Sequence, residues 1–134
     1  MTKKSKRIFN ILKVLAQSSE GVKNSNHTAA ILYRGKIIAF GWNHTKTHPF
    51  QKQYSRRPEE CFFHAEIHAI HNALKKLELR ELEKSTLYVL RLKNNGEVSN
   101  SCPCTGCRIA IKMFNIGSVF YSVDDKEGFH GYMG

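Results

Sequence analysis

The sequence of 134 residues contains no apolar run of the roughly 20 residues that a membrane-spanning helix needs. Its first residues show no apolar stretch followed by a small-residue cleavage site, so we expect no secretion signal. Cysteine is also scarce: there are four, and three of them crowd between Cys102 and Cys107. Such spacing is poor for a disulfide framework and suits a metal site. We therefore expect a cytoplasmic location, no membrane partner and reduced thiols.

Acidic residues are the second shortage. Eleven Asp and Glu stand against 21 Lys and Arg, which gives a formal net charge of +10. This excess favours an anionic substrate or a polyanionic partner. A plainer explanation is a solvated basic tail, since four of the charges are on Lys3, Lys4, Lys6 and Arg7. The length favours a single domain over residues 1–134, with a basic tail at 1–6 and a short C-terminal tail at 124–134.

The apolar pattern predicts three helices and four strands. Helices are predicted where apolar residues recur every three or four positions, and strands where short β-branched runs end in turn residues. Two Ile-rich runs separated by Arg34-Gly35 are typical of a hairpin. Helices alternating with strands indicate a layered α/β domain in which helices cover a sheet. The predicted helices span residues 8–17, 63–77 and 104–114, and the predicted strands span residues 28–33, 36–42, 86–92 and 118–123.

Two short motifs carry the candidate chemistry. His64-Ala65-Glu66 supplies an imidazole and a carboxylate, and Pro103-Cys104-Thr105-Gly106-Cys107 supplies two thiols. One imidazole and two thiolates suit a catalytic zinc, which keeps its fourth position open for water. Both motifs fall at predicted helix N-termini, where the helix dipole favours thiolates. Together they form the H-x-E … P-C-x-x-C pattern of zinc-dependent nucleobase deaminases.

On these residues the chain resembles the zinc-dependent cytidine and deoxycytidylate deaminase superfamily, and it is most similar to short phage and viral deoxycytidylate deaminase-like members. The resemblance covers about residues 8–121. It implies a three-layer α/β/α cytidine deaminase-like fold with a mixed sheet of four to five strands. For a viral protein, the location would be the host cytoplasm. The matching segments are Gly41-Trp42-Asn43-His44, His64-Ala65-Glu66-Ile67-His68-Ala69-Ile70, Thr86-Leu87-Tyr88-Val89 and Ser101-Cys102-Pro103-Cys104-Thr105-Gly106-Cys107.

The resemblance also implies a reaction. His64, Cys104 and Cys107 would hold one Zn²⁺ per chain, and zinc lowers the pKa of a bound water from 15.7 to roughly 7. The resulting hydroxide would attack C4 of a cytosine ring, while Glu66 shuttles the proton and helps ammonia leave. The expected enzyme is a zinc-dependent deaminase, a hydrolase acting on the C–N bond of a cyclic amidine. The expected substrate is a small nucleotide, with dCMP converted to dUMP.

Substrate contacts are implied in the same way. The backbone N–H of Ala65 would hold the pyrimidine carbonyl and Asn43 would hold the sugar, although an Asn also suits the end of a strand. The polar stretch at 43–60 concentrates basic residues, and such donors suit a 5′-phosphate. A solvated basic loop would have the same composition. The candidate phosphate donors are Lys46, His48 and Arg56, with Lys52 and Arg57 nearby.

Several features leave alternatives open. A structural zinc knuckle would need a fourth protein ligand, which Cys61 or Cys102 could supply. His68 and His71 share a helix flank with His64, as a second metal site or as buried or interfacial histidines would. Arg91 interrupts an apolar strand and could point into the phosphate or base pocket.

The segment between Val89 and Pro103 is longer than in many relatives. Its Asn94-Asn95-Gly96 predicts a small hairpin above the site. The C-terminal segment 124–134 is too short for a further helix and strand, so a sheet edge is left to cover. Exposed edges invite pairing, and members of the superfamily tend to oligomerise, so we expect a homo-oligomer.

Two other functions compete with nucleotide deamination. A deaminase of cytosine or adenosine in tRNA or single-stranded DNA would use the positive charge. The sequence lacks, however, the alternating aromatic and basic residues that would stack successive bases. An inactive zinc-stabilised scaffold is the third class, and it would have no use for Glu66.

Overall fold

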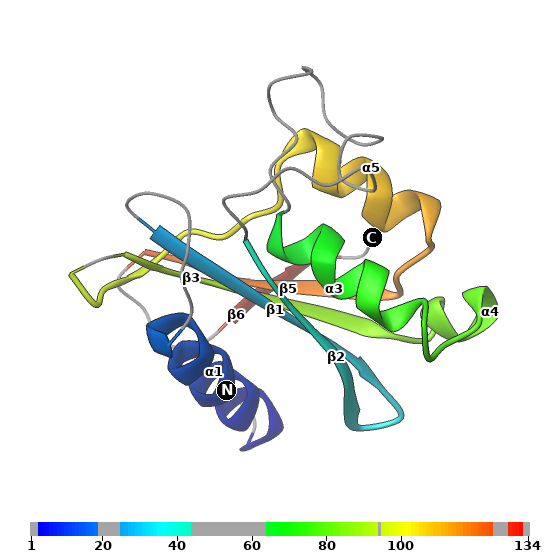
Figure 1. Cartoon of the computed structure of the whole chain (residues 1–134), viewed down its shortest axis with the longest axis horizontal. Coiled ribbons are helices and arrows are strands. Elements are labelled where there is room, and N and C mark those ends of the chain that lie inside the picture. The colour runs from blue at the N-terminus through cyan, green and yellow to red at the C-terminus, as the bar shows by residue number, and fades with distance from the viewer. Residues whose placement is uncertain (1–2, 19–24, 44–63, 94, 125–128, 133–134) are drawn as a thin grey trace.

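The computed structural model describes residues 3–18, 25–43, 64–93, 95–124 and 129–132. A mixed sheet forms its centre, with strands in the order β2-β1-β3-β5-β6 and the short β4 paired to β3. Among the described strands, β3 and β5 pair in parallel and the other pairs are antiparallel. Helices cover both faces of the sheet (Figure 1). The elements are α1 (Lys3–Ser18), β1 (Ser25–Tyr33), β2 (Lys36–Trp42), α3 (Ala65–Ala73), α4 (Leu79–Leu82), β3 (Thr86–Lys93), β4 (Val98–Ser99), α5 (Thr105–Met113), β5 (Ser118–Ser122) and β6 (Phe129–Tyr132).

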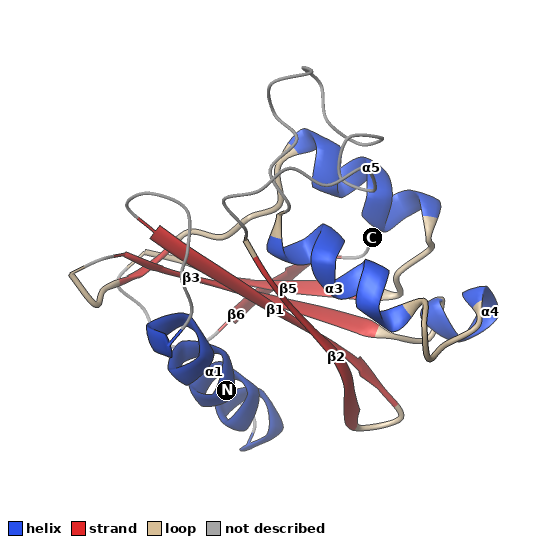
Figure 2. Ribbon diagram, viewed as in Figure 1, coloured by secondary structure: helices blue, strands red, loops and turns tan. Residues whose placement is uncertain are grey.

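The two faces of the sheet carry separate apolar cores. On one face α1 buries Ile8, Phe9 and Leu12 against alternate residues of β1 and β3. On the other face α3 and α5 lie side by side, and their apolar residues pack on Ala29, Ile31 and the opposite set of β3 residues (Figure 2). Successive strand residues point to opposite faces, so β1 and β3 serve both cores. The expected three-layer α/β/α architecture is confirmed.

The β1–β2 hairpin forms where the two Ile-rich runs predicted it. Both turn residues, Arg34 and Gly35, have positive φ angles of 52° and 77°. Two consecutive left-handed residues make the type of turn whose twist matches that of the flanking strands. The second predicted strand coincides with β2, and the other predicted strands match β1, β3 and β5 to within three residues.

Three elements differ from the prediction. The first helix begins at Lys3, so the expected basic tail forms its first turns; no Pro or Gly interrupts this segment. The short helix α4 closes itself with a reciprocal capping box between Glu78 and Glu81. Four residues of the expected C-terminal tail form β6. The ring of Phe129 packs there against that of Tyr88, with 5.0 Å between the ring centroids. The described part of the sheet therefore has six strands, of which two are very short, where four to five were expected.

The longer segment after β3 forms the predicted small hairpin. Gly96 has a φ of 88°, and Arg91 and Leu92 of β3 pair with Ser99 and Val98 of β4. The chain then leaves the sheet and reaches α5, whose N-terminus faces that of α3. None of the helices in the described part of the chain has the length and apolarity needed to cross a membrane.

Candidate metal centre

The metal motifs occupy the starts of two neighbouring helices. His64 is the N-cap residue of α3 and Cys104 is the N-cap residue of α5. Both have extended backbone, and neither side chain caps its own helix with a hydrogen bond. An N-cap side chain ordinarily accepts from a free N–H of the first turn. At both positions the side chain points instead toward the other helix, where the three candidate ligands meet.

The distances among these ligands suit one small ion. Nδ1 of His64 lies 3.4 Å from the Cys107 sulfur and 3.7 Å from the Cys104 sulfur. All three donor atoms lie within 4.8 Å of one another. Tetrahedral zinc, with bonds of about 2.0–2.3 Å, would separate nitrogen and sulfur by about 3.6 Å. The residues therefore fit zinc, and because Cys104 is exposed the group is open to solvent on one side.

The two thiols are electrostatically coupled. The contact with Cys107 holds the pKa of the Cys104 thiol far below its ordinary value, with a further lowering from His64. The same contact and burial raise the pKa of Cys107 well above its ordinary value. These opposite shifts favour a thiolate at Cys104 and a protonated thiol at Cys107. Metal binding releases such protons because the metal ligand is the thiolate.

Glu66 lies two residues beyond His64, in the first turn of α3. Its side chain is only 5% exposed. Burial raises the pKa of this carboxyl, against a lowering by the nearby His64 charge. A carboxyl whose pKa is raised holds a proton more readily, which suits a group that takes up and returns a proton. The Cys107 thiol also acts on Glu66, which shows that the carboxyl reaches the metal group.

The position of α3 is fixed by β2. A methyl group added at Gly41 would collide with the Ala65 carbonyl oxygen and the Ala69 backbone nitrogen. Only glycine therefore permits this close approach of strand and helix. Two side chains of α3 bond the same strand: Nδ1 of His68 accepts from the Trp42 N–H at 3.1 Å, and the Asn72 amide donates to the Phe40 carbonyl at 2.8 Å.

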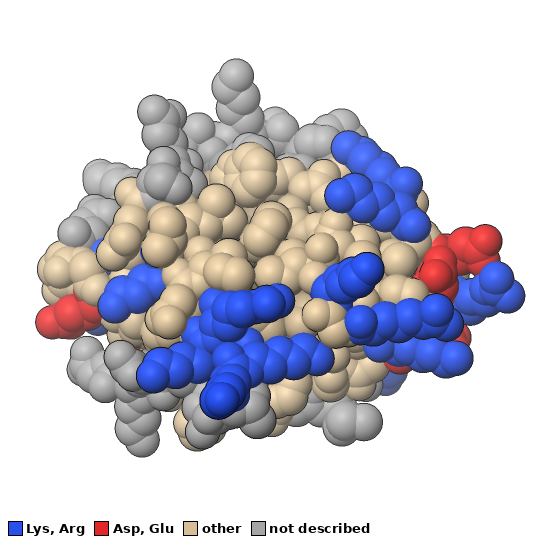
Figure 3. Space-filling model, turned by 90° about the horizontal axis from the view of Figure 1, so that it is seen from below, with Lys and Arg blue, Asp and Glu red and all other residues tan. Residues whose placement is uncertain are grey.

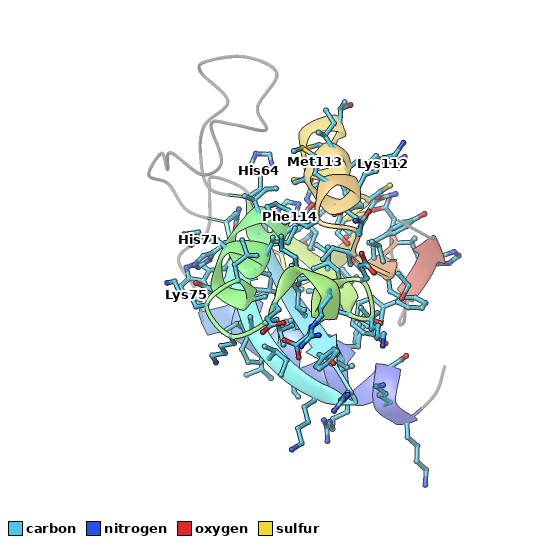
Figure 4. All side chains as sticks on the ribbon, turned by 90° about the vertical axis from the view of Figure 1, so that its right-hand side faces the viewer. His64, His71, Lys75, Lys112, Met113 and Phe114 are labelled. Carbon is cyan, nitrogen blue, oxygen red and sulfur yellow. The ribbon has the colours of Figure 1, made fainter. Side chains whose placement is uncertain are left out.

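These contacts decide between the interpretations of the two later histidines. His68 is buried, and the Trp42 indole packs edge-on against its ring at 4.4 Å. Its role is structural. His71 lies on the outer flank of α3 near Lys75, whereas His64 stands at the start of the helix beside α5 (Figure 4). Among the described residues, neither His68 nor His71 joins the metal group.

A serine network fixes the segment that leads to the thiols. The Ser101 hydroxyl donates to the Val89 carbonyl at 2.9 Å, and the Ser122 hydroxyl donates to the Ser99 carbonyl at 2.7 Å. Ser122 also accepts from the Arg91 N–H at 3.1 Å, which ties β5 to β3 beyond their last ladder pair. Asp124 completes the network by accepting from Ser99 and from the Asn100 N–H.

Cys102 lies outside the ligand group of the described residues. Its sulfur accepts from the Arg108 guanidinium at 2.9 Å, and its N–H donates to the Asn100 side chain at 2.8 Å. The fourth cysteine, Cys61, lies outside the described residues, as do Lys46, His48 and Arg56.

The two other expected substrate contacts flank the metal group. Ala65 is fully buried at the first position of α3, and its backbone N–H is among those that a helix leaves unpaired at its start. Asn43 directly follows β2 and is 8% exposed. Its side-chain oxygen accepts from the His27 N–H at 3.0 Å, and its own N–H donates to the His27 carbonyl at 3.2 Å. It therefore closes the end of the β1–β2 ladder.

Sequence reasoning missed His27. The residue lies at the N-terminal end of β1 and its pKa is lowered to about 4, first by burial and then by the charges of Arg91 and His64. The signal was present in the strand alternation. His27 stands two residues before Ala29, which faces α3, so the same face of the sheet had to carry the imidazole.

Comparisons with known proteins agree with this site. The family model described as the cytidine and deoxycytidylate deaminase zinc-binding region matches residues 2–123. No curated protein matches the chain in sequence. Among solved structures, a cytidine deaminase from Burkholderia pseudomallei is similar with a TM-score of 0.66 at 15% identity, over 99% of this chain and 93% of that one.

Two further solved structures share the fold. A dCMP deaminase from the cyanophage S-TIM5, in complex with dCMP and dUMP, is similar with a TM-score of 0.60 at 23% identity, over 90% of this chain and 82% of that one. Acinetobacter baumannii RibD gives a TM-score of 0.55 at 17% identity, over 89% of this chain and 28% of that one. Residues 2–123, which the family model matches, contain both metal motifs and almost all of the sheet. The chain belongs to the cytidine and deoxycytidylate deaminase family, whose zinc ion the His64, Cys104 and Cys107 group is positioned to bind.

Proposed function

We propose that the protein deaminates a free cytosine nucleotide, converting dCMP and water to dUMP and ammonia. The observation that carries this proposal is the buried carboxyl of Glu66 beside an open His64, Cys104 and Cys107 group. A structural zinc site has four protein ligands and needs no proton carrier. In the described part of the chain the group has three, and the solvent-facing side is where a reacting water would enter.

Each residue has a proposed task. His64, Cys104 and Cys107 hold the zinc, which when bound supplies a water of lowered pKa and Lewis acidity. Glu66 takes one proton from the attacking water and passes it to N3 of the ring, then takes the second proton from the new hydroxyl on C4 and passes it to the leaving amine. Ammonia then leaves from C4 as the carbonyl of uracil forms. The Ala65 N–H holds the pyrimidine carbonyl and thereby sets the ring orientation.

The choice of a nucleotide rests on Asn43 and on the basic residues that follow it in the sequence. Asn43 is the proposed sugar contact, since it lies beside His27 and the metal group at one edge of the sheet. Lys46, His48 and Arg56 are the proposed phosphate donors in the loop that follows. Charge reversal at Lys46 and Arg56 should raise KM for dCMP far more than for deoxycytidine. Equal effects on both substrates would show that Lys46 and Arg56 do not bind the phosphate.

A substrate screen tests the function directly. Ammonia release from the zinc-loaded protein is measured with dCMP, dCTP, cytidine, deoxycytidine, deoxyadenosine and guanine. We expect the highest kcat/KM with dCMP. Release from none of these monomers, together with conversion of a cytosine in an oligonucleotide, would overturn the proposal in favour of a nucleic-acid deaminase.

One observation favours that second function. The side of the molecule toward which α1 and the β1–β2 turn point carries many Lys and Arg side chains and few acidic ones (Figure 3). The helix contains no Asp or Glu, and the exposed basic residues there include Lys3, Lys4, Lys6 and Arg7 of α1, with Arg34 and Lys36 at the turn. However, α1 covers the face of the sheet opposite the metal group. A nucleic-acid strand bound to α1 would therefore not bring one of its bases to Glu66.

We also propose that the protein forms a homo-oligomer. In the described part of the chain, β2 and β6 are the outer strands of the sheet, and α5 exposes Ile109 and Met113 one turn apart. Edges and apolar surfaces of this kind are commonly covered by pairing. Light scattering should give a mass of at least twice 15.4 kDa. A monomer at high concentration would contradict the proposal.

A further inference from the structure

Three polar residues form a row across the sheet beside the metal group. Asn43 follows β2, His27 lies on β1 and Arg91 lies on β3, and these three strands are neighbours. Asn43 bonds both backbone groups of His27, and His27 is paired with Arg91 in the β1–β3 ladder. The three residues therefore stand at the same level of the sheet, at the edge where the chain leaves toward α3.

The side chains of this row face the α3 and α5 side. Ala29 and Val89 belong to the core beneath these helices, and His27 and Arg91 each lie two residues further along their strands. Residues two apart on a strand share a face. The charges of Arg91, His64 and Cys104 all act on the His27 imidazole, which shows that the row and the metal ligands lie within electrostatic reach of one another.

Arg91 is the member of the row whose side-chain Nε lacks a hydrogen-bond partner in the described part of the chain. Its Nε is buried, and no acceptor for it exists among the described residues. No carboxylate of the described ranges forms a salt bridge with Arg91. The exposed Asp124 carboxylate is bonded to Ser99 and Asn100 and lies within electrostatic reach of the guanidinium without contacting it. A guanidinium stays charged in proteins. Leaving such a group buried without an acceptor costs about 1–3 kcal/mol or more.

The backbone of Arg91 is held on three sides. Its N–H donates to the Ser122 hydroxyl, and it pairs with His27 on one flank and with Ser99 on the other. A side chain on so constrained a backbone is presented in a fixed direction, which lowers the entropy that ligand binding must overcome. The arrangement is thus one of a half-buried cation at the edge of the metal site, whose Nε has no acceptor among the described residues.

We propose that Arg91 binds the anionic group of the substrate, and that it selects a nucleotide 5′-phosphate over the uncharged nucleoside. The proposal rests on the proposed function, because it assigns the phosphate of that substrate to a residue of strand β3. A neutral acceptor such as the base carbonyl would bring no negative charge to the guanidinium, which forms no salt bridge with a described carboxylate. A phosphate neutralises the charge and matches the planar donor fork in two parallel bonds.

The test compares binding of dUMP and deoxyuridine by calorimetry, because a product pair requires no turnover. Zinc-loaded wild type, Arg91→Gln, Arg91→Lys and the matched control Lys93→Gln are measured. Lys93 lies two residues along the same strand and is exposed. We expect Arg91→Gln to weaken dUMP binding about 10- to 100-fold, as the loss of a charge-assisted contact does. Deoxyuridine binding should change less than about 3-fold, Lys93→Gln should change neither, and Arg91→Lys should keep part of the preference.

The outcomes separate this inference from the proposed function. Equal weakening of dUMP and deoxyuridine, or an unchanged preference for dUMP in Arg91→Gln, overturns the role of Arg91 while dCMP turnover by wild type still stands. Wild type that binds neither compound also overturns it. Wild type that deaminates no cytosine monomer, yet binds dUMP through Arg91, refutes the proposed function alone. Should Arg91→Gln fail to fold or to hold zinc, Arg91→Lys carries the comparison, and undiminished dUMP binding in both folded variants counts against the proposal.

Discussion

The hydroxyls of Ser101 and Ser122 lie 2.8 Å apart and join the segment before the metal thiols to the last residue of β5. Around this pair, β3 and β5 have ceased to pair with each other, and side chains replace the missing ladder. Ser99, Ser101 and Ser122 are buried, so the hydrogen bonds among them matter more than a bond at the surface. This network sets where the chain enters α5 and hence where Cys104 and Cys107 stand.

Ser122→Ala should therefore be strongly destabilising. The change leaves the Arg91 N–H and the Ser99 carbonyl without their partner. We expect the free energy of unfolding to fall by about 2–3 kcal/mol, since unsatisfied buried groups cost about 1–3 kcal/mol each. Urea denaturation measures this. Ser118→Ala on the same strand is the control, because it removes only a half-buried bond to Thr86. Equal losses of unfolding free energy in both variants would show that the network stabilises the fold no more than a single half-buried hydrogen bond does.

Glu66→Gln should separate chemistry from metal binding. The amide keeps the shape of the carboxyl but cannot accept and donate the proton, so turnover of dCMP should drop by about 10²–10⁴-fold. Zinc content, measured by metal analysis, should stay near one per chain. Because burial disfavours the ionised carboxyl, the neutral amide should not lower the melting temperature. The exposed Glu97→Gln is the control, and wild-type turnover in Glu66→Gln would show that the assigned proton carrier is wrong.

Metal removal should cost both activity and stability. Cys107→Ser and His64→Ala should each lose zinc and melt at a lower temperature, as should wild type treated with a chelator. Cys102→Ser should keep its zinc, because the Cys102 sulfur is bonded to Arg108 and stands apart from the ligand group. If Cys102→Ser lost its zinc, Cys102 would be a fourth ligand and the centre would be structural.

Gly41→Ala should damage the site without touching a ligand. The added methyl group would collide with the backbone of α3, and the helix must move away from β2. We expect a loss of several kcal/mol in unfolding free energy, as for other overpacked positions, together with weaker zinc binding in a competition assay. Gly35→Ala is the matched control, because its methyl meets nothing within 4 Å. That control should cost only about 1–2 kcal/mol for its positive φ and leave zinc binding unchanged.

Acid should destabilise the protein partly through His27. Its pKa is lowered to about 4 from 6.5, mainly by burial. Between pH 6.5 and 4 the unfolded chain therefore binds a proton at His27 and the folded chain does not. The unfolding free energy is undiminished by His27 above pH 6.5, and it falls as the pH is lowered to 4. The loss is on the order of 2–3 kcal/mol. Unfolding free energies of wild type and His27→Gln at pH 7 and pH 4.5 should diverge, and parallel profiles would refute a half-buried neutral imidazole.

Much of the fold could be predicted from sequence because local patterns and tertiary packing agree. The periodicities around Ile31 and Ile67 marked their buried faces, and Arg34-Gly35 marked the hairpin turn. The strand β6 could not be predicted, because four residues with a central Gly have no pattern of their own. It forms through contacts of Phe129 with rings on β3 and α1, which are distant in sequence.

The metal site was predicted more fully than its surroundings. His64, Cys104 and Cys107 meet as their spacing implied, and Glu66 lies beside them. The role of His27 depends on which residues the sheet places next to it, and no local pattern encodes that neighbourhood. The phosphate role of Lys46, His48 and Arg56 stays a prediction.

Since the two helices start with metal ligands in place of capping side chains, a bound zinc would act as a cross-link. His64 and Cys104 are 40 residues apart in the chain. Closing a loop of that length removes about 4 kcal/mol of unfolded-state entropy, by the same chain-entropy relation that applies to disulfides. The ion would thereby supply, in a reducing environment, the constraint that a secreted protein obtains by oxidation. The supply of zinc would then control how much folded protein a cell contains, as well as how much of it is active.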